Sequence, residues 1–360
     1  MKSIFSHPSS LLDETVVNTI RQNAGQAETL CQLHPAQLKL VHEQKWLKFF
    51  VPKEYGGMEM SLPEILKLEE SLAWADGSTA WVVTLCAGAA WFVGFLDSEF
   101  AAEIFANDNV FIAGSGMTTG TAEKTEDGFV VNGFWKYASG AQHATHFTAN
   151  CVITKNGKPV LEKGKPRIRA FVFSKNEVTI HNTWNSMGMV ATASHSFEVK
   201  NLTVPTPRQF LIDSTRAVID KPIFHFPFLQ LTETTLTVNL SGMALRFIEL
   251  AEELLKAKSS GTKAIAHSKK KIEDQRKAFY KIVESSWRIC ESRKVISKSM
   301  LAQLSKESHA LAVCSRQVVN DLFPYCGLRA ADTSTEINRV WRNVHTASQH
   351  NLFASKQWQL

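Results

Sequence analysis

The hydrophobic pattern of this chain changes twice along its length, and these changes limit the folds available to it. In residues 11–105 apolar side chains recur with the spacing of amphipathic helices, as at Leu62 and Ile65. Residues 110–210 instead contain short β-branched and aromatic runs separated by Asp-Gly and Asn-Gly turns. Helical periodicity returns after Pro222 and continues towards the C-terminus. The pattern therefore predicts a strand-rich segment between two helical ones.

This order predicts an α+β fold that is mostly α. A length of 360 residues is also long for a single core and suggests two or three domains. We expect an N-terminal helical domain over residues 1–109, a central antiparallel β domain or barrel over 110–215, and a C-terminal four-helix bundle over 216–360. The four bundle helices are expected near residues 229–258, 264–296, 298–322 and 333–353.

One segment raises the question of a membrane. Residues 79–96 carry no charge, which meets the lower length limit for a transmembrane helix. Asp76 and Asp97 bound the segment and no Lys or Arg flanks it, so we expect a helix buried in the protein core and no membrane partner. The N-terminus lacks the pattern of a secretory signal, and the expected location is cytoplasmic.

Several other classes of site are disfavoured. The six cysteines are scattered without a C-x-x-C pair, so reduced thiols are expected rather than a zinc site or a disulfide framework. His143 and His146 have a helical spacing but follow a predicted strand and lack a third ligand, so no metal is assigned. The net charge of +6 is mild, and the basic run at 269–271 is interpreted as a solvated helix face with no nucleic-acid partner.

A predicted hairpin leads into the most informative segment. Asp127 and Gly128 precede the apolar run at 129–131, which is a strong local hairpin signal. A second turn pair, Asn132-Gly133, is expected to bend the chain again. Residues 132–140 read Asn-Gly-Phe-Trp-Lys-Tyr-Ala-Ser-Gly and place an aromatic-rich strand beside a hydroxyl.

Three further segments accompany this strand in a fixed order. They are Val-Pro-Lys-Glu-Tyr-Gly-Gly at 51–57, Trp-Asn-Ser-Met-Gly at 184–188 continuing to Val-Pro at 204–205, and Trp-Arg-Asn-Val-His at 341–345 closing on Gln-His at 349–350. In this order and at these distances, the four segments resemble the acyl-CoA dehydrogenase superfamily. The resemblance is strongest to its flavin-dependent monooxygenases of two-component systems and spans nearly the whole chain.

The resemblance implies a flavin site on the central domain. Ser139 would bring its hydroxyl and amide near the N5 edge of the flavin. Tyr137, two residues earlier and therefore expected on the same strand face, would pack against the isoalloxazine. A glycine-rich loop at 113–120 and the segment at 184–195 would approach the cofactor as well, although a plain loop and a packed strand Trp are their structural alternatives. The candidate cofactor-binding residues are Ser115, Met117, Tyr137, Ser139, Gly140, Trp184 and Thr192.

His350 is the main catalytic candidate, together with Ser139 as a hydrogen-bond donor. By the resemblance, His350 is the last histidine of a C-terminal helix and faces flavin and substrate. A histidine there can accept a proton from a phenol near neutral pH. Without the resemblance, a lone helical histidine is more often a surface or core residue.

The sequence also departs from the dehydrogenases of the superfamily. An acyl-CoA dehydrogenase needs a carboxylate base beside the substrate α-carbon, yet no acid follows Glu336. Glu233 is a reserve base, about two residues out of register with the Ser-Gly landmark at 241–242. The arginine expected after Gly188 is Val190, and the expected aspartate after Arg342 is Asn343.

The preferred function is therefore a monooxygenase that uses reduced flavin and O2 on a small organic, aromatic substrate. An FAD-dependent acyl-CoA dehydrogenase and a flavin-binding protein without turnover are the alternatives. The resemblance implies FAD or FMN as the cofactor. The dehydrogenase pattern Arg-x-x-x-Phe-Gly, which helps hold the adenosine half of FAD, is not evident around Arg276 and Phe279, and its absence there favours FMN or a loosely bound flavin. The resemblance further implies a separate flavin reductase and a homotetramer or homodimer.

Overall fold

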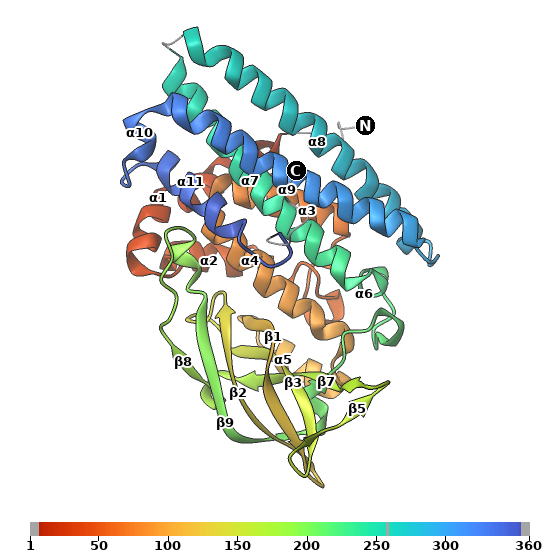
Figure 1. The fold of residues 1–360 in the computed structure, drawn as a ribbon. Helices are drawn as coiled ribbons and strands as arrows, with labels where there is room; N and C mark the ends of the chain where they lie inside the picture. The colour runs from red at the N-terminus through yellow and green to blue at the C-terminus, as the bar shows by residue number, and fades with distance from the viewer. Residues whose placement is uncertain (1–6, 257–258, 354–360) are drawn as a thin grey trace.

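Most helices from both ends of the chain form one layer above a large sheet in the computed structural model, which describes residues 7–256 and 259–353, while α5 lies beside the sheet (Figure 1). The N-terminal helices are α1 Glu14–Leu30, α2 Pro35–Glu43, α3 Leu62–Ala75, α4 Gly77–Ala90 and α5 Ser98–Phe105. The C-terminal helices are α6 Pro222–His225, α7 Phe228–Leu255, α8 Ser259–Glu291, α9 Lys298–Cys326, α10 Leu328–Ala331 and α11 Glu336–Ala347. The four long helices expected near the C-terminus are confirmed as α7, α8, α9 and the shorter α11.

The sheet is mixed, so the expectation of a wholly antiparallel β domain is wrong at one pair of strands. Its strands are β1 Ile112–Lys124, β2 Gly128–Ala138, β3 His146–Lys155, β4 Lys158–Pro159, β7 Ile168–Ser174, β8 Thr179–His181, β9 His195–Pro205 and β10 Gln209–Phe210, and a separate hairpin pairs β5 Leu161–Glu162 with β6 Lys165–Pro166. β1 pairs β2 antiparallel on one side and β3 parallel on the other. The short connection after β2 starts β3 at His146, beside Ile112 at the start of β1, and so the two strands run in the same direction.

Of the two turns predicted next to and within β2, one is present. The Asp-Gly hairpin between β1 and β2 is confirmed, with the Thr125 amide donating to the Gly128 carbonyl at 3.0 Å. The second bend expected at Asn132-Gly133 is wrong, because β2 continues through it with a bulge against β9. A Cβ on Gly133 would lie 2.3 Å from the Trp135 ring, so a close approach of the indole explains the glycine.

Helix α4 is the apolar centre of the molecule. Asp76 caps its N-terminus, with its carboxylate accepting from the Thr79 amide at 2.9 Å, and a short 3-10 helix continues it from Trp91 to Phe95. Residues 77–95 are long and apolar enough to cross a membrane, but 83% of this stretch is buried inside the protein. The expectation of a buried core helix is therefore confirmed.

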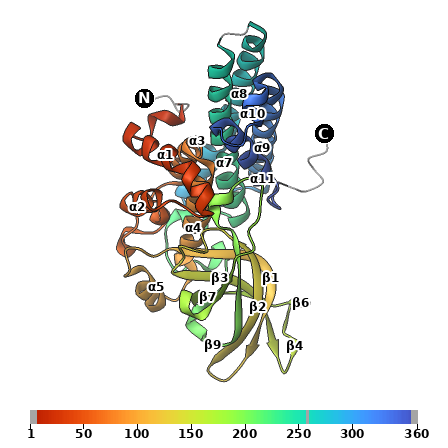
Figure 2. The same ribbon diagram turned by 90° about the vertical axis from the view of Figure 1, so that its left-hand side faces the viewer.

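The N-terminal and C-terminal helices pack on each other directly. Figure 2 shows α1 and α2 on one side of this layer and α8 and α9 on the other, with α3 and α7 between them. A Cβ on Gly242 of α7 would lie 2.2 Å from the Glu70 carbonyl of α3, so these two helices are in close contact at that point. The division into domains at residues 109 and 215 stays a prediction, since α3 and α4 both pack on α7.

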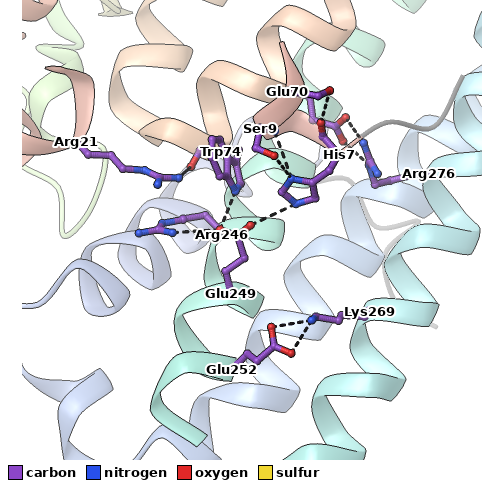
Figure 3. Close-up of polar contacts among 11 residues, drawn as sticks. His7, Ser9, Arg21, Glu70, Trp74, Arg246, Glu249, Glu252, Lys269 and Arg276 are labelled. Carbon is purple, nitrogen blue, oxygen red and sulfur yellow. Dashed lines mark hydrogen bonds and ion pairs between the residues drawn. The ribbon is translucent and has the colours of Figure 1, made fainter. Parts of the chain in front are cut away.

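A buried ion pair joins three of these helices (Figure 3). The Arg276 guanidinium of α8 donates two hydrogen bonds to the Glu70 carboxylate of α3, at 2.8 and 2.7 Å. Tyr280 and Ser241 also donate to this carboxylate, from α8 and α7. Glu70 and Arg276 are 2% and 7% exposed, so neither charge has water as an alternative partner.

Polar contacts also attach the N-terminal segment to α7, near the Glu70–Arg276 ion pair. The Trp74 indole and the His7 ring both contact Glu249, at 2.9 and 3.3 Å. The Arg21 guanidinium lies 4.1 Å from the centroid of a Trp74 ring, within the range of a cation–π contact. Polar contacts from α1 and α3 therefore converge on one end of the bundle.

Replacing Glu70 with Gln should destabilise the protein strongly, because it leaves the Arg276 guanidinium buried without a counter-charge. We expect a loss of about 3–5 kcal/mol in the free energy of unfolding, measured by chemical denaturation. The matched control is Glu252→Gln, which removes the half-exposed pair with Lys269 at 2.7 Å and should cost less than about 1 kcal/mol. Equal losses in the two variants would contradict the importance of the buried pair.

Candidate active site

A large cavity lies where the sheet, the helix layer and the chain after α11 meet. Its volume is about 1120 Å³. Residues of β1, β2, α4 and α7 line it, together with residues 345–347 at the end of α11 and residues 349–352 after that helix. This exceeds the usual size of a pocket for one small molecule, which is about 300–1,000 Å³. The cavity has room for a cofactor ring system and a substrate together.

Hydroxyl groups form a chain along the sheet side of the cavity. The Ser139 and Ser194 hydroxyls are 2.8 Å apart, and the Ser194 and Thr192 hydroxyls are 2.7 Å apart. Thr192 in turn donates to the Met189 carbonyl at 2.7 Å, which ends the chain on the backbone. Ser139 and Ser194 both line the cavity, whereas Thr192 is fully buried behind them. Ser194 is not among the residues predicted from the sequence, although its hydroxyl connects two that are, Ser139 and Thr192.

Tyr137 and Ser139 reach the cavity in a different way from the one predicted. β2 ends at Ala138, and its register against β9 shifts between Trp135 and Ala138. Tyr137 itself has a positive φ of 66°. The expected alternation along one strand face is therefore wrong, because the irregular backbone interrupts the two-residue period. Both side chains still line the cavity, Tyr137 being 60% exposed and Ser139 buried.

The remaining candidates on the sheet have distinct positions. Ser115 and Met117 line the cavity, and the Ser115 hydroxyl donates to the Lys136 carbonyl at 2.7 Å. Gly140 is not part of the lining. With φ at +75°, its amide donates to the Thr192 carbonyl at 2.7 Å and so connects the turn after β2 to the segment before β9.

Trp184 belongs to the segment between β8 and β9, which lines the cavity. Its indole donates to the Met189 carbonyl at 2.9 Å, and its amide donates to His195 at 3.1 Å. The ring meets Tyr137 edge to face, with centroids 6.2 Å apart. Trp184 and Tyr137 thus form an aromatic wall beside the hydroxyl chain.

Helix α11 holds this segment through two adjacent residues. The Asn343 side-chain oxygen accepts from the Met189 amide at 2.6 Å. Arg342 donates to the Met187 carbonyl at 2.7 Å and to the carboxylate of Glu28 on α1. A Cβ on Gly188 would lie 2.2 Å from the Arg342 carbonyl, so the two backbones are in close contact. No pattern in the sequence indicates that Asn343 contacts this segment.

His350 lines the cavity in the turn that follows α11, three residues beyond the end of the helix. Its ring lies edge to face with Trp81 of α4, at 6.0 Å between centroids, and also contacts Phe353. Burial among these rings lowers the pKa of His350 below its usual value. The neutral imidazole is therefore the dominant form at neutral pH and can accept a proton.

Glu233 lies away from the cavity. It is buried against α9, where Ser305 donates to its carboxylate and His309 lies 3.3 Å from it. The cavity lining contains no Asp or Glu in the described part of the chain. The reserve position for a carboxylate base is thus occupied by a helix–helix contact.

No group of three or more potential metal ligands occurs within residues 7–256 and 259–353. Burial, with help from the charge of Lys175, lowers the pKa of His143 to about 4. All six cysteines are free thiols, and all except Cys31 are buried.

The sheet side of the cavity fits a flavin ring. A flat aromatic system can lie against the Tyr137 and Trp184 rings, and the hydroxyls of Ser139 and Ser194 can hydrogen-bond to its polar edge. Gly114 and Gly116 leave that part of β1 without side chains, so a cofactor can approach its backbone. The residues that would hold the ring are Ser115, Met117, Tyr137, Ser139, Trp184 and Ser194.

Comparison with known proteins gives one family and a consistent set of relatives. Residues 234–355 match the family described as acyl-CoA dehydrogenase, C-terminal domain. An indole-3-acetate monooxygenase of Acinetobacter baumannii is 28% identical over 314 residues, covering 83% of this chain and 79% of that protein. The oxygenase subunit HsaA of a flavin-dependent monooxygenase from Rhodococcus jostii is 22% identical and covers 94% of this chain and 92% of its own length.

Solved structures share the fold over almost the whole chain. The 3-HSA hydroxylase from Rhodococcus has a TM-score of 0.89 at 20% identity, covering 96% of this chain and 93% of its own. XiaF from Streptomyces, in complex with FADH2 and glycerol, has a TM-score of 0.86 at 17% identity and covers 94% and 89%. TdsC from Paenibacillus, in complex with FMN and indole, has a TM-score of 0.79 at 17% identity and covers 94% and 92%.

Replacing Asn343 with Ala should loosen the cavity-lining segment between β8 and β9, because the Met189 amide loses its acceptor. We expect faster hydrogen exchange at Met189, a change in Trp184 fluorescence, and a loss of about 1–3 kcal/mol in stability. Asn320→Ala is the matched control, since the exposed Asn320 side chain bonds the His345 ring at 2.8 Å rather than the Met189 amide. Unchanged exchange at Met189 in the Asn343 variant would contradict this role.

Proposed function

This chain belongs to the acyl-CoA dehydrogenase superfamily, and we propose that it is the oxygenase component of a two-component flavin-dependent monooxygenase that hydroxylates an aromatic substrate. The observation that carries the proposal is the pairing of a hydroxyl-lined aromatic wall with a buried histidine, in a cavity whose described lining residues include no carboxylate. The named activities of relatives, such as oxygenation of indole-3-acetate and 3-hydroxylation of p-hydroxyphenylacetate, support an aromatic substrate.

The proposed reaction inserts one oxygen atom of O2 into a C–H bond of the substrate, and the other oxygen atom leaves as water. Reduced FAD or FMN, when bound, supplies the two electrons that this stoichiometry requires. The hydroxyls of Ser139 and Ser194 would donate hydrogen bonds where negative charge develops at the cofactor edge. Tyr137 and Trp184 would hold the ring plane and keep water away from that edge.

His350 would accept a proton from the substrate. A substrate hydroxyl becomes a stronger electron donor to its ring as it loses its proton, which favours oxygen transfer to the ring. The imidazole of His350 is neutral near pH 7 because burial lowers its pKa, so one ring nitrogen has a lone pair for that proton. The Leu352 amide contacts Nδ1 at the long distance of 3.4 Å, and protonation of Nδ1 would replace this contact. Trp81 packs against the imidazole and supports its orientation.

The acyl-CoA dehydrogenase alternative is disfavoured, because the described cavity lining provides no carboxylate to act as the catalytic base. Removal of an α-proton from an acyl thioester requires a carboxylate beside the substrate. Neither Asp nor Glu occurs among the described residues that line the cavity, and Glu233 contacts Ser305 and His309 instead. A flavin-binding protein without turnover would have no need of a neutral histidine on the cavity wall.

The proposal includes a partner protein. Relatives are named as oxygenase subunits or components, which implies a separate flavin reductase that supplies the reduced cofactor. We also propose a cytoplasmic homo-oligomer, either a dimer or a tetramer. The cofactor would be held without the Arg-x-x-x-Phe-Gly contact. In support of this, the Arg276 guanidinium is buried and donates two hydrogen bonds to Glu70 inside the chain.

Oxygen chemistry can be tested directly by rapid mixing. Anaerobically reduced FMN or FAD is combined with the protein and mixed with O2 while the absorbance is followed. We expect a transient absorbance band that differs from those of the reduced and the oxidised flavin, and slower return of the oxidised spectrum than in free solution. Direct reoxidation at the rate of free flavin would contradict the proposed function, and so would bleaching of oxidised flavin by an acyl-CoA without O2.

His350→Gln should lower turnover with an aromatic substrate by about 10²-fold, because it removes a general base. In the unchanged protein, activity should be lost only as the pH falls through the lowered pKa of His350, below about 6.5, and should be level above it. His345→Gln is the control, since both ring nitrogens of His345 already contact protein oxygens. Product formation with an unchanged pH profile in His350→Gln would exclude this role.

A further inference from the structure

Acidic and strongly basic side chains are almost absent from the cavity. Among the described residues that line it there is no Asp, Glu or Arg, and the cationic candidates are Lys136 and two histidines. Lys136 belongs to β2 and precedes Tyr137, so it lies on the sheet wall, where the flavin fits. Its side chain is exposed. The helix wall therefore has no permanent positive charge.

The two histidines do not provide that charge at neutral pH. Burial lowers the pKa of both, at His350 among aromatic rings and at His345 despite the raising effect of its bond to the Trp341 carbonyl. A carboxylate placed against the helix wall would lose its hydration and gain no cation in return. Burying an unpaired charge is strongly unfavourable.

The helix wall is instead apolar, with two threonines of α7 between hydrophobic residues. The cavity is lined by Phe228, Leu231 and Leu236 of α7, by Leu85 of α4, and by Phe92 just after α4. These side chains suit the faces and edges of an aromatic ring system.

The threonine hydroxyls on this wall are arranged as acceptors. The Thr232 hydroxyl donates to the Phe228 and Leu229 carbonyls, at 3.0 and 2.8 Å. The Thr235 hydroxyl donates to the Thr232 carbonyl at 3.2 Å. Since each hydroxyl has one proton and that proton is used within the helix, the oxygen has only lone pairs left for a ligand. At these two hydroxyls a ligand therefore has to bring the donor.

We propose that the substrate is an uncharged aromatic molecule whose polar groups are hydrogen-bond donors, such as a phenolic hydroxyl or a ring N–H, and that the α7 wall selects against carboxylates. This inference rests on the proposed function and narrows its substrate class. It separates this chain from relatives named for carboxylate substrates, such as indole-3-acetate monooxygenase.

Matched ligand pairs test the charge preference. Equilibrium binding to the flavin-loaded protein is measured by calorimetry at pH 7.5 for indole-3-acetamide against indole-3-acetate, and for 4-hydroxyphenylacetamide against 4-hydroxyphenylacetate. Each pair has nearly the same shape and differs in charge. We expect the amide to bind at least about tenfold more tightly than the acid, because the acid buries an unpaired charge. Equal or tighter binding of the acid, or binding of no member of either pair, would overturn the proposal.

A second comparison tests the acceptor role of α7. In Thr235→Val the affinity for 2-naphthol should fall about threefold to tenfold, whereas the affinity for naphthalene should not fall. The matched control is Thr234→Val on the same helix, whose hydroxyl also donates to helix carbonyls but does not line the cavity. Equal losses for both ligands, or the same selective loss in the Thr234 variant, would argue against donor recognition by this wall.

The binding measurements remain distinct from the test of oxygen chemistry. If the transient absorbance band is absent while amides still bind preferentially, the monooxygenase proposal fails and the ligand class stands. If the band forms and the acids bind as well as the amides, the ligand class fails alone. Loss of acid binding in Lys136→Met would then assign the carboxylate contact to the sheet wall and refute selection by α7.

Discussion

The buried carboxylate of Glu70 determines how three helices meet, and the cavity depends on that meeting point. It accepts hydrogen bonds from Arg276 and Tyr280 on α8 and from Ser241 on α7, while Glu70 itself belongs to α3. Four donor contacts on one carboxylate satisfy its lone pairs, which is the condition for an ion to remain buried. Next to it, α7 approaches α3 closely enough to require Gly242. The position of α7 along α3 is fixed there, and with it the helix wall of the cavity.

The two walls of the cavity have complementary chemistry. Residues of the sheet and of the segment before β9 present hydroxyls and aromatic rings, while α4 and α7 present apolar side chains and occupied threonine hydroxyls. A cofactor with a polar edge and a substrate with an apolar body can therefore lie against different walls and face each other. His350 comes from a third part of the chain, after α11, and reaches the same space. Such convergence of distant segments is common where a rigid scaffold positions reactive groups.

Local patterns predicted most of the fold, because they depend on neighbouring residues. The bundle helices followed from apolar periodicity, and the buried helix α4 followed from a charge-free run with no basic flanks. The parallel pairing of β1 with β3 could not be predicted in this way, since it depends on where the chain crosses after β2. The irregular backbone at Tyr137 likewise depends on the pairing of β2 with β9. The cavity-lining position of His350 was expected only from the family resemblance.

Asn343 shows what sequence reasoning could not reach. The resemblance led to an expected Arg-Asp pair in α11, and Asn343 in place of the acid left Arg342 without an obvious partner. Arg342 instead pairs with Glu28 of α1, far away in sequence, and also holds the Met187 carbonyl. The side chain at position 343 therefore faces a backbone amide and has no cation to pair with. An aspartate at this position would add an unpaired buried charge. An asparagine offers the same acceptor oxygen to the Met189 amide without that charge. The substitution thus preserves the attachment of the Trp184 segment, provided that Glu28 supplies the negative charge that Arg342 requires.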